Sequence, residues 1–177
     1  MDWCIDSKKV GLALENSKES YRIRVNDIVY EITSKQKYSN EKLALIEQNM
    51  KTFYQKYWKW DPVKKRKELK LKEMRFINVL KENQLIGFAS YTFIHEHDED
   101  KTLNVLYLFE IQIKDKGNGI GTLLLKKIIK IAKDFEMEQI RLTCFKNNAA
   151  LEWYIKYGFI VTRDYGEYVD LSKEVEN

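Results

Sequence analysis

Apolar residues recur at helical spacing over the first long segment of the chain. From Ser39 onward they lie three or four positions apart, at Leu43, Ile46, Met50, Phe53 and Tyr57. This spacing predicts an amphipathic helix that Ser39 or Asn40 caps and that ends near Trp58–Trp60. The following Asp61-Pro62 disfavours continuation, and Pro62 suits the first turn of a second, very basic helix over residues 62–73.

Two more helices are expected in the second half of the chain. Residues 122–135 place lysines opposite one apolar face, which consists of Leu123, Leu124, Ile128, Ile131 and Ala132. Residues 147–157 form the second of these helices.

Runs rich in β-branched and aromatic residues predict the strands. They cover residues 21–32 (with a possible turn at Asn26-Asp27), 75–81, 85–94, 105–113, 139–145 and 158–168. The acidic link 95–104 reads as a loop. Strands and helices mix without strict alternation, so we expect one α/β (α+β) domain over residues 21–177, with a mixed, mainly antiparallel sheet flanked by helices. Residues 1–20 are expected to form a tail or a short helix.

Composition and charge narrow the class of protein. The chain has 177 residues, 44% of them hydrophobic and 13% aromatic, which argues against disorder. A net charge of +4 permits an anionic ligand or a nucleic-acid partner and demands neither. Two cysteines, Cys4 and Cys144, and two histidines, His95 and His97, are too few for a disulfide scaffold or a structural zinc site, so no metal is expected. We find no secretory signal and no apolar run long enough to span a membrane.

The segment Lys116–Gly121, KGNGIG, lies between a buried strand and a helix and has the character of an anion site. Glycines permit left-handed dihedrals and close approach of a ligand, and amides at a helix N-terminus favour negative charge. A diphosphate is the natural ligand. Thr122 stands where the dinucleotide fingerprint needs a third glycine, and no Gly-Lys-Ser/Thr follows as in a P-loop. A plain turn is the alternative for this segment.

The order of motifs around this loop is more specific than the loop alone. Glu110–Ile113 ends a strand, KGNGIG follows, and about thirty residues later come Asn147, Ala150, Tyr154 and Gly158-Phe159. Over residues 75–163 this order resembles the GCN5-related N-acetyltransferase superfamily. Lys116 stands where that superfamily usually has Arg or Gln, and it keeps the positive charge.

The resemblance implies that acetyl-CoA binds at the splayed end of two strands. The diphosphate would lie on the amides of Gly117–Thr122, and the pantetheine would pair with the backbone of Ile111–Ile113, where a backbone N–H near Ile111 could serve the oxyanion. Tyr154 would act as the general acid, with a simple packing role as its alternative. The full set of implied cofactor residues is Ile111, Gln112, Ile113, Lys116, Gly117, Asn118, Gly119, Ile120, Gly121, Thr122, Asn147, Asn148 and Tyr154.

Three further stretches look like those of the NatD-type N-alpha-acetyltransferases. They are Asn49–Tyr54 with Trp58–Trp60, Val105–Glu110, and Leu142–Asn147, and the likeness runs from Tyr21 to Ser172. That family acetylates the amino termini of histones two-A and four, which begin Ser-Gly-Arg-Gly. The resemblance therefore implies a monomeric enzyme of the cytoplasm and nucleus whose partner is a protein N-terminal peptide such as a histone tail, without a required nucleic-acid or membrane partner.

By position, the resemblance also assigns roles at the acceptor. Tyr54 and Trp58 would line the peptide entrance, while Thr143 and Tyr168 would hydrogen-bond the peptide backbone. Tyr107 and Glu110 would face the amine, with Glu110 as base directly or through water. Glu110, Tyr107, Tyr54 and Tyr154 are thus the candidate catalytic residues. Phe109 departs from the tyrosine frequent in the family, and Glu96 is the candidate for the family's acidic residue.

Several alternatives stay open from the residues alone. Glu110 could be a strand-end carboxylate paired with a lysine, and Trp58 and Trp60 could be core residues. The run Lys64–Lys67 invites a nuclear-localisation or phosphate-binding reading, but a solvated helix face is simpler. The acidic residues of 96–100 form either a groove for a basic tail or a solvated loop. At the level of function, the rivals are an acetyltransferase for lysine side chains or small polyamines, and an acyl-CoA-binding sensor.

Overall fold

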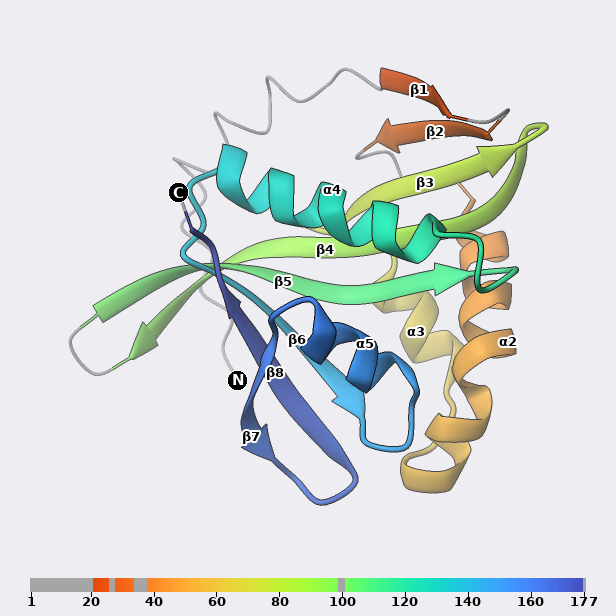
Figure 1. Cartoon of the computed structure of the whole chain (residues 1–177). Helices are drawn as coiled ribbons and strands as arrows, with labels where there is room; N and C mark the ends of the chain where they lie inside the picture. Colours follow the sequence, from red (N-terminus) through yellow and green to blue (C-terminus); the bar gives the residue numbers. More distant parts are fainter. Residues whose placement is uncertain (1–20, 26–27, 34–37, 99–100, 177) are drawn as a thin grey trace.

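A computed structural model describes residues 21–25, 28–33, 38–98 and 101–176. Its centre is an eight-stranded sheet in the order β1-β2-β3-β4-β5-β6-β8-β7 (Figure 1). The strands are β1 (Tyr21–Val25), β2 (Ile28–Thr33), β3 (Arg75–Lys81), β4 (Gln84–Asp98), β5 (Lys101–Ile113), β6 (Gln139–Phe145), β7 (Ile160–Asp164) and β8 (Tyr168–Glu174). Within the described residues only β5 and β6 pair in parallel, so the predicted mixed, mainly antiparallel sheet is confirmed. The expected tail or helix at residues 1–20 lies outside the described residues.

Helices cover both faces of this sheet (Figure 1). On one face lie α2 (Ser39–Tyr57) and α3 (Pro62–Glu68), and on the other lie α4 (Ile120–Asp134) and α5 (Ala150–Lys156). Each face therefore has its own core. The α2 face buries Leu43, Ile46, Leu69, Phe76 and Phe88. The α4 face buries a larger set that includes Val79, Leu106, Leu124, Ile128 and Phe159.

The start of α3 shows how local sequence decides an element. Asp61 Oδ1 accepts hydrogen bonds of 2.9 Å from the backbone N–H groups of Val63 and Lys64, and Pro62 occupies the first turn. This sharp start, which the sequence predicted, turns the chain back so that α3 lies against α2, where Arg66 Nη1 donates to Asn40 Oδ1 in the first turn of α2 at 2.5 Å. The two helices together wall one side of the sheet at the end of β5.

The parallel pairing of β5 with β6 is short. It joins Val105–Tyr107 to Gln139–Arg141, and beyond these residues the two strands separate within the described chain. A bulge in β5 lies next to the point of separation, because Ser90 pairs with Glu110 while Tyr91 pairs with Leu108, which leaves Phe109 as the extra residue. The separation opens the sheet between its fifth and sixth strands.

The structure corrects several predicted boundaries. The acidic segment 95–104 is a hairpin and not a loop, because β4 continues to Asp98 and β5 begins at Lys101. His95 and Asn104 pair across it, and their side chains form a 2.7 Å hydrogen bond. A strand whose faces remain in water can contain acidic residues. The acidic composition of this segment therefore did not distinguish a hairpin from a loop.

Other differences follow from packing and from turns. The second helix ends at Glu68 instead of residue 73, because Leu69 leaves it to enter the core. The helix predicted from Asn147 begins at Ala150, and no side chain caps α2 at Ser39 or Asn40, where Tyr38 holds the cap position. The segment 158–168 is not one strand, since a turn at Gly166, with φ of 87°, separates β7 from β8.

Candidate active site

A cleft of about 1050 Å³ lies where β5 and β6 separate. Residues of α2, α3, β5, the glycine loop, β6 and α5 line it. Nearly all of the site residues predicted from the sequence reach this cleft. The exception is Ile120, whose side chain is buried in the core beneath α4. The cleft therefore brings together residues from both halves of the chain, and its two ends differ in chemistry.

The glycine loop forms one end. Gly117 and Gly119 have φ values of 85° and 80°, and a Cβ built on either would meet nothing within 4 Å. Glycine is therefore required at these positions by the left-handed backbone and not by steric contact with other residues of the protein. Asn118 Oδ1 accepts the backbone N–H of Ile120 at 3.2 Å, which secures the start of α4. Open space over left-handed amides at a helix N-terminus fits a diphosphate, and Lys116 lies on the same rim.

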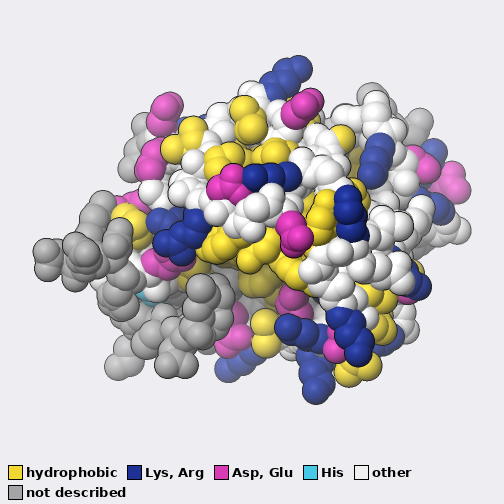
Figure 2. Space-filling model, turned by 90° about the horizontal axis from the view of Figure 1, so that it is seen from below, with side chains coloured by type: hydrophobic (Ala, Val, Ile, Leu, Met, Phe, Trp, Pro, Cys, Tyr) yellow, Lys and Arg dark blue, Asp and Glu magenta, His cyan; other side chains and the backbone are white. Residues whose placement is uncertain are grey.

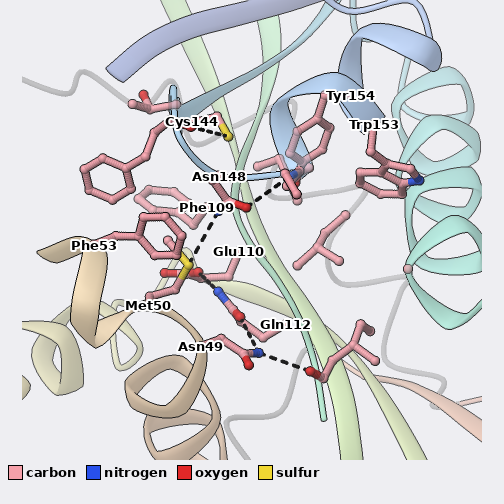
Figure 3. Close-up of a pocket in the computed structure, with 18 of the residues that line it drawn as sticks. Asn49, Met50, Phe53, Phe109, Glu110, Gln112, Cys144, Asn148, Trp153 and Tyr154 are labelled. Carbon is pink, nitrogen blue, oxygen red and sulfur yellow. Dashed lines mark hydrogen bonds between the residues drawn. The ribbon is translucent and has the colours of Figure 1, made fainter. Parts of the chain in front are cut away.

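The backbone of β5 leads from this loop toward the middle of the cleft. Ile111, Gln112 and Ile113 all line it, as the sequence predicted. Asn49 of α2 reaches the same edge, where its Nδ2 donates to Gln112 Oε1 at 2.9 Å and to the Ile113 carbonyl at 3.1 Å (Figure 3). No role was predicted for Asn49, since an amide inside a helix carries no sequence signal of a cross-sheet contact.

Across the cleft, the loop before α5 and α5 itself supply the other wall. Asn147 and Asn148 both line the cleft, as expected. Asn148 Oδ1 accepts the N–H of Ala150 at 3.0 Å, and its Nδ2 lies 3.9 Å from the sulfur of Met50 on α2 (Figure 3). This contact joins the two walls near the middle of the cleft.

Tyr154 of α5 lines the cleft from a buried position. Its ring packs on Trp153 and Phe159 with centroid distances of 4.8 and 5.4 Å. Burial raises the pKa of the Tyr154 phenol, so the group stays protonated across the neutral range. The predicted packing role and the predicted position at the cleft are both observed, and a protonated phenol can donate a proton or a hydrogen bond there.

Glu110 lies at the centre of the cleft and is only 6% exposed. Its Oε2 accepts a 2.7 Å hydrogen bond from Gln112 Nε2, and its Oε1 accepts a 3.2 Å bond from Lys65 Nζ. Figure 3 shows Glu110, Gln112 and Asn49 in one line of side chains along the wall. The Glu110 carboxylate is thus paired with a lysine, which was one of the alternatives from the sequence. It also lines the cleft, as a general base must.

Lys65 corrects the prediction of a solvated basic face on α3. Its side chain is only 11% exposed, and its Nζ donates to Glu68 Oε1 at 2.7 Å as well as to Glu110. The same ammonium lies 5.4 Å from the centre of the Tyr54 ring. Burial opposes the charged form, but Glu110, Tyr54 and Glu68 outweigh it and raise the pKa of Lys65. Lys65 is therefore a fixed cation inside the cleft.

A second hydrogen-bond chain crosses the separation of the strands. Thr143 Oγ1 of β6 donates to Asp170 Oδ1 of β8 at 2.7 Å, so the 2.9 Å bond between Tyr107 and Thr143 must have the phenol as donor. Burial raises the pKa of Tyr107. With its proton directed to Thr143, the Tyr107 hydroxyl can act toward the cleft only as an acceptor.

Aromatic rings enclose the end of the cleft opposite the glycine loop. Trp58 at the end of α2 contacts Phe145 and Tyr168 with centroid distances of 4.8 and 5.0 Å. Tyr54 contacts both Trp58 and Phe145. Burial, and then the charge of Glu110, raise the pKa of Tyr54 to about 12. The predicted entrance residues Tyr54 and Trp58 therefore lie together, beside Tyr168, which was predicted to hydrogen-bond the peptide backbone. Trp58 stays 43% exposed at the surface.

The acidic residues of 96–100 contribute less to the cleft than the alternative of a groove for a basic tail would require. Glu96 forms an ion pair with Arg141 of β6 and does not line the cleft. Residues 99 and 100 lie outside the described part of the chain. Among the described residues there is no cluster of three or more His, Cys, Asp or Glu side chains able to hold a metal ion. In the same residues, no helix is both long and apolar enough to cross a membrane.

Comparison with known proteins identifies the family. The sequence pattern of the Acetyltransferase (GNAT) family matches residues 30–159. The spermine/spermidine N(1)-acetyltransferase of Bacillus subtilis (strain 168) is 35% identical over 82 residues, which are 44% of this chain and 54% of that protein. The chain therefore matches only about half the length of this curated relative. A probable spermine N(1)-acetyltransferase of Bacillus subtilis subsp. natto matches to the same extent.

Solved structures show the same fold at low sequence identity. The paiA N-acetyltransferase of Thermoplasma acidophilum, in complex with coenzyme A, superposes with a TM-score of 0.64 at 19% identity and covers 82% of this chain and 98% of its own. Arabidopsis thaliana NAA60, in complex with a bisubstrate analogue, gives a TM-score of 0.61 at 12% identity over 84% and 99% of the two chains. The chain therefore belongs to the GNAT family, whose acetyltransferases take their acetyl group from acetyl-CoA.

Proposed function

We propose that this chain transfers the acetyl group of acetyl-CoA to the α-amine of a protein N-terminus, of the Ser-Gly-Arg-Gly type that the NatD-type resemblance implies. The donor half of the proposal rests on the glycine loop. The amides of Gly117–Thr122 would hold the diphosphate, and the open edge of Ile111–Ile113 would take the pantetheine as an added strand. Bound there, acetyl-CoA supplies an activated acyl thioester.

The observation that carries the acceptor half is the contact between Trp58 and Tyr168. It joins the end of α2 to the start of β8 and closes the cleft over Phe145. The N-terminus of a substrate protein can enter this aromatic end of the cleft with its first residue. A lysine side chain presented from mid-peptide must bring flanking backbone on both sides, which would collide with these rings. The enclosure therefore favours a terminal amine over an internal lysine.

The polar groups beside the enclosure suit an amine. Tyr107, whose proton is committed to Thr143, can accept a hydrogen bond from the nitrogen. The Glu110 carboxylate can remove the proton, either directly or through an ordered water, which is a modest task because an α-amine titrates near ~8. On the far wall, protonated Tyr154 can donate to the departing sulfur.

A small polyamine is the second candidate acceptor, and the curated relatives favour it. One is a spermine/spermidine N(1)-acetyltransferase and the other a probable spermine N(1)-acetyltransferase, and each shares 82 aligned residues with this chain. The carboxylates of Glu68 and Glu110 on the cleft wall are the chemistry that a cationic amine requires. A nucleic-acid partner has less support, because on the face seen in Figure 2 basic and acidic side chains are interspersed around an apolar centre.

Competition between acceptors tests the proposal. The full chain is incubated with acetyl-CoA and, in separate reactions, a Ser-Gly-Arg-Gly peptide that contains lysines, the same peptide with a blocked N-terminus, spermidine and spermine. We expect the highest kcat/KM for the unblocked peptide, with the acetyl group on the α-amine by mass spectrometry. Acetylation of the blocked peptide would instead support lysine side chains as acceptors, and a preference for spermidine would support the second candidate. With a histone tail as acceptor, we propose action in the cytoplasm and nucleus.

A further inference from the structure

Charged side chains are few along the cleft. Within the described residues, those that line it are Lys65, Glu68, Glu110 and Lys116. Lys116 belongs to the glycine loop at the donor end. The acceptor end therefore has three charged groups, two carboxylates and one ammonium, and both carboxylates lie within hydrogen-bonding distance of the same Lys65 nitrogen.

Two nearby carboxylates, Asp170 and Glu96, do not line the cleft. Asp170 accepts from Thr143 at 2.7 Å and from the Tyr165 hydroxyl at 3.1 Å. Glu96 is paired with Arg141. The side-chain amides of Gln112 and Asn49 continue the row of hydrogen bonds from Glu110, and they are neutral. The formal charges of the three side chains that line the acceptor end therefore sum to −1, and Asp170, behind Thr143, adds a carboxylate that is the same in every variant considered below.

Several contacts hold the Lys65 ammonium in place at the acceptor end. It donates to two carboxylates, it lies beside the Tyr54 ring, and the α3 helix that carries it is fixed at its start by the Asp61 cap. A buried ion pair with additional hydrogen bonds is costly to break. An incoming amine will therefore find the ammonium in place and compete with it for the same carboxylate oxygens.

We propose that Lys65 is a specificity-determining residue, which limits the acceptor end to substrates with a single positive charge at the reacting amine. One net negative charge matches one ammonium. A polyamine brings further ammonium groups into a partly buried space where Lys65 already neutralises one of the two carboxylates, and like charges there repel. This inference deepens the proposed function and rests on it, because it explains how an α-amine is preferred over spermidine in a family that includes polyamine acetyltransferases.

A charge series at positions 65 and 68 tests the proposal. E68Q brings the acceptor end to about 0, the wild type and K65M/E68Q have about −1, and K65M has about −2. The acceptors are a C-terminally amidated Ser-Gly-Ala-Gly peptide, whose only positive charge is the α-ammonium, and spermidine. We expect the kcat/KM ratio of spermidine to peptide to rise about tenfold for each added negative charge. K65R should keep the wild-type ratio because it keeps the charge.

The double variant separates charge from structure. K65M alone leaves two buried carboxylates together and can unfold the chain, whereas K65M/E68Q removes both partners and keeps the net charge. We expect K65M/E68Q to restore a ratio near that of the wild type, although it lacks both side chains. A ratio in folded E68Q that equals the wild-type ratio, or an unchanged ratio across all folded variants, overturns the proposal. The wild-type ratio by itself tests the proposed function, so the two can fail separately.

Discussion

Asn49 of α2 and Gln112 of β5 are joined by a 2.9 Å hydrogen bond between their side-chain amides. The bond fixes which way the Gln112 amide faces, and its Nε2 is thereby directed at Glu110. A helix on one face of the sheet thus orients the carboxylate proposed as the base. Three residues from two elements act together before any substrate enters.

The first prediction concerns Glu110. Glu110→Gln should lower kcat/KM for the amine acceptor by ~10²–10⁴, the usual range for general acid–base catalysis, while the affinity for acetyl-CoA stays unchanged. The loss should shrink as the pH rises, because more of the amine is then already neutral. Steady-state kinetics from pH 6.5 to 9 measures this. Glu47→Gln, which removes a carboxylate from an exposed pair with Lys51, is the matched control. A wild-type rate for Glu110→Gln at pH 7 would remove Glu110 from the mechanism.

The second prediction concerns the glycine loop. Gly119→Asp should weaken acetyl-CoA binding by at least tenfold, because a carboxylate would face the diphosphate and the residue must keep a φ of 80°. Gly119→Asn adds a side chain of the same shape without charge, and Asn tolerates the left-handed region, so it should bind more tightly than the Asp variant. Calorimetric titration compares them. Gly166→Asp, at a left-handed glycine outside the cleft lining, should leave the affinity unchanged.

The third prediction concerns the Tyr107–Thr143–Asp170 chain. Thr143→Val removes the hydroxyl that accepts from Tyr107 and donates to Asp170. We expect the KM for the amine acceptor to rise about tenfold while the KM for acetyl-CoA stays constant, and the unfolding free energy to fall by about 1 kcal/mol. Thr143→Ser keeps the hydroxyl and should retain most of the acceptor affinity. A KM for the amine acceptor in Thr143→Val no higher than in Thr143→Ser would show that the hydrogen bonds of this hydroxyl do not support acceptor binding.

The fourth prediction concerns stability and Lys42. This lysine is buried under α2, with its Nζ 3.6 Å from the centre of the Phe76 ring. Burial lowers its pKa from 10.5 to about 7. Between these values the unfolded chain binds more protons than the folded one, so the unfolding free energy should rise with pH from 7 to 10.5. The slope from this group is at most about 1.4 kcal/mol per pH unit.

Denaturant unfolding of the wild type and Lys42→Met across this range measures that slope. We expect the variant to be the more stable protein at pH 7, and its advantage to decline toward pH 10.5 as the penalty in the wild type disappears. Lys51→Met, at an exposed position on the same helix, should run parallel to the wild type. A constant difference between Lys42→Met and the wild type at all pH values would mean that Lys42 titrates normally.

The parts of the fold that the sequence predicted well are those with strong periodicity or special backbone. Helices α2 and α4 follow from apolar spacing over four turns or more, and β3 and β6 were predicted with the bounds observed. The glycine loop was predicted because left-handed dihedrals require glycine, whatever the rest of the chain does. The 95–104 hairpin was missed because its composition resembles that of a loop.

The acceptor end shows why the rest could not be predicted. Lys64, Lys65, Arg66 and Lys67 are chemically alike in sequence, yet successive residues of a helix point about 100° apart, and only Lys65 reaches the cleft. Which of the four turns inward depends on how α3 lies on the sheet. The bulge at Phe109 has no sequence signal either, and it is part of the reason why the neighbouring residues Phe109 and Glu110 both line the cleft.

The short pairing of β5 with β6 has a consequence for the behaviour of the protein in the cell. Beyond Tyr107 the sheet has two strand edges in its interior, in the part of the chain that the structure describes, and strand edges are templates for pairing with other chains. Asn49 covers one carbonyl of this edge, at Ile113. Coenzyme A, bound as proposed along Ile111–Ile113, would cover more of it, and by mass action a concentration of a hundred times its Kd would stabilise the folded chain by about 2.7 kcal/mol. We therefore expect resistance to aggregation to vary with cofactor supply, so that starvation for coenzyme A would lower the amount of folded enzyme as well as its rate.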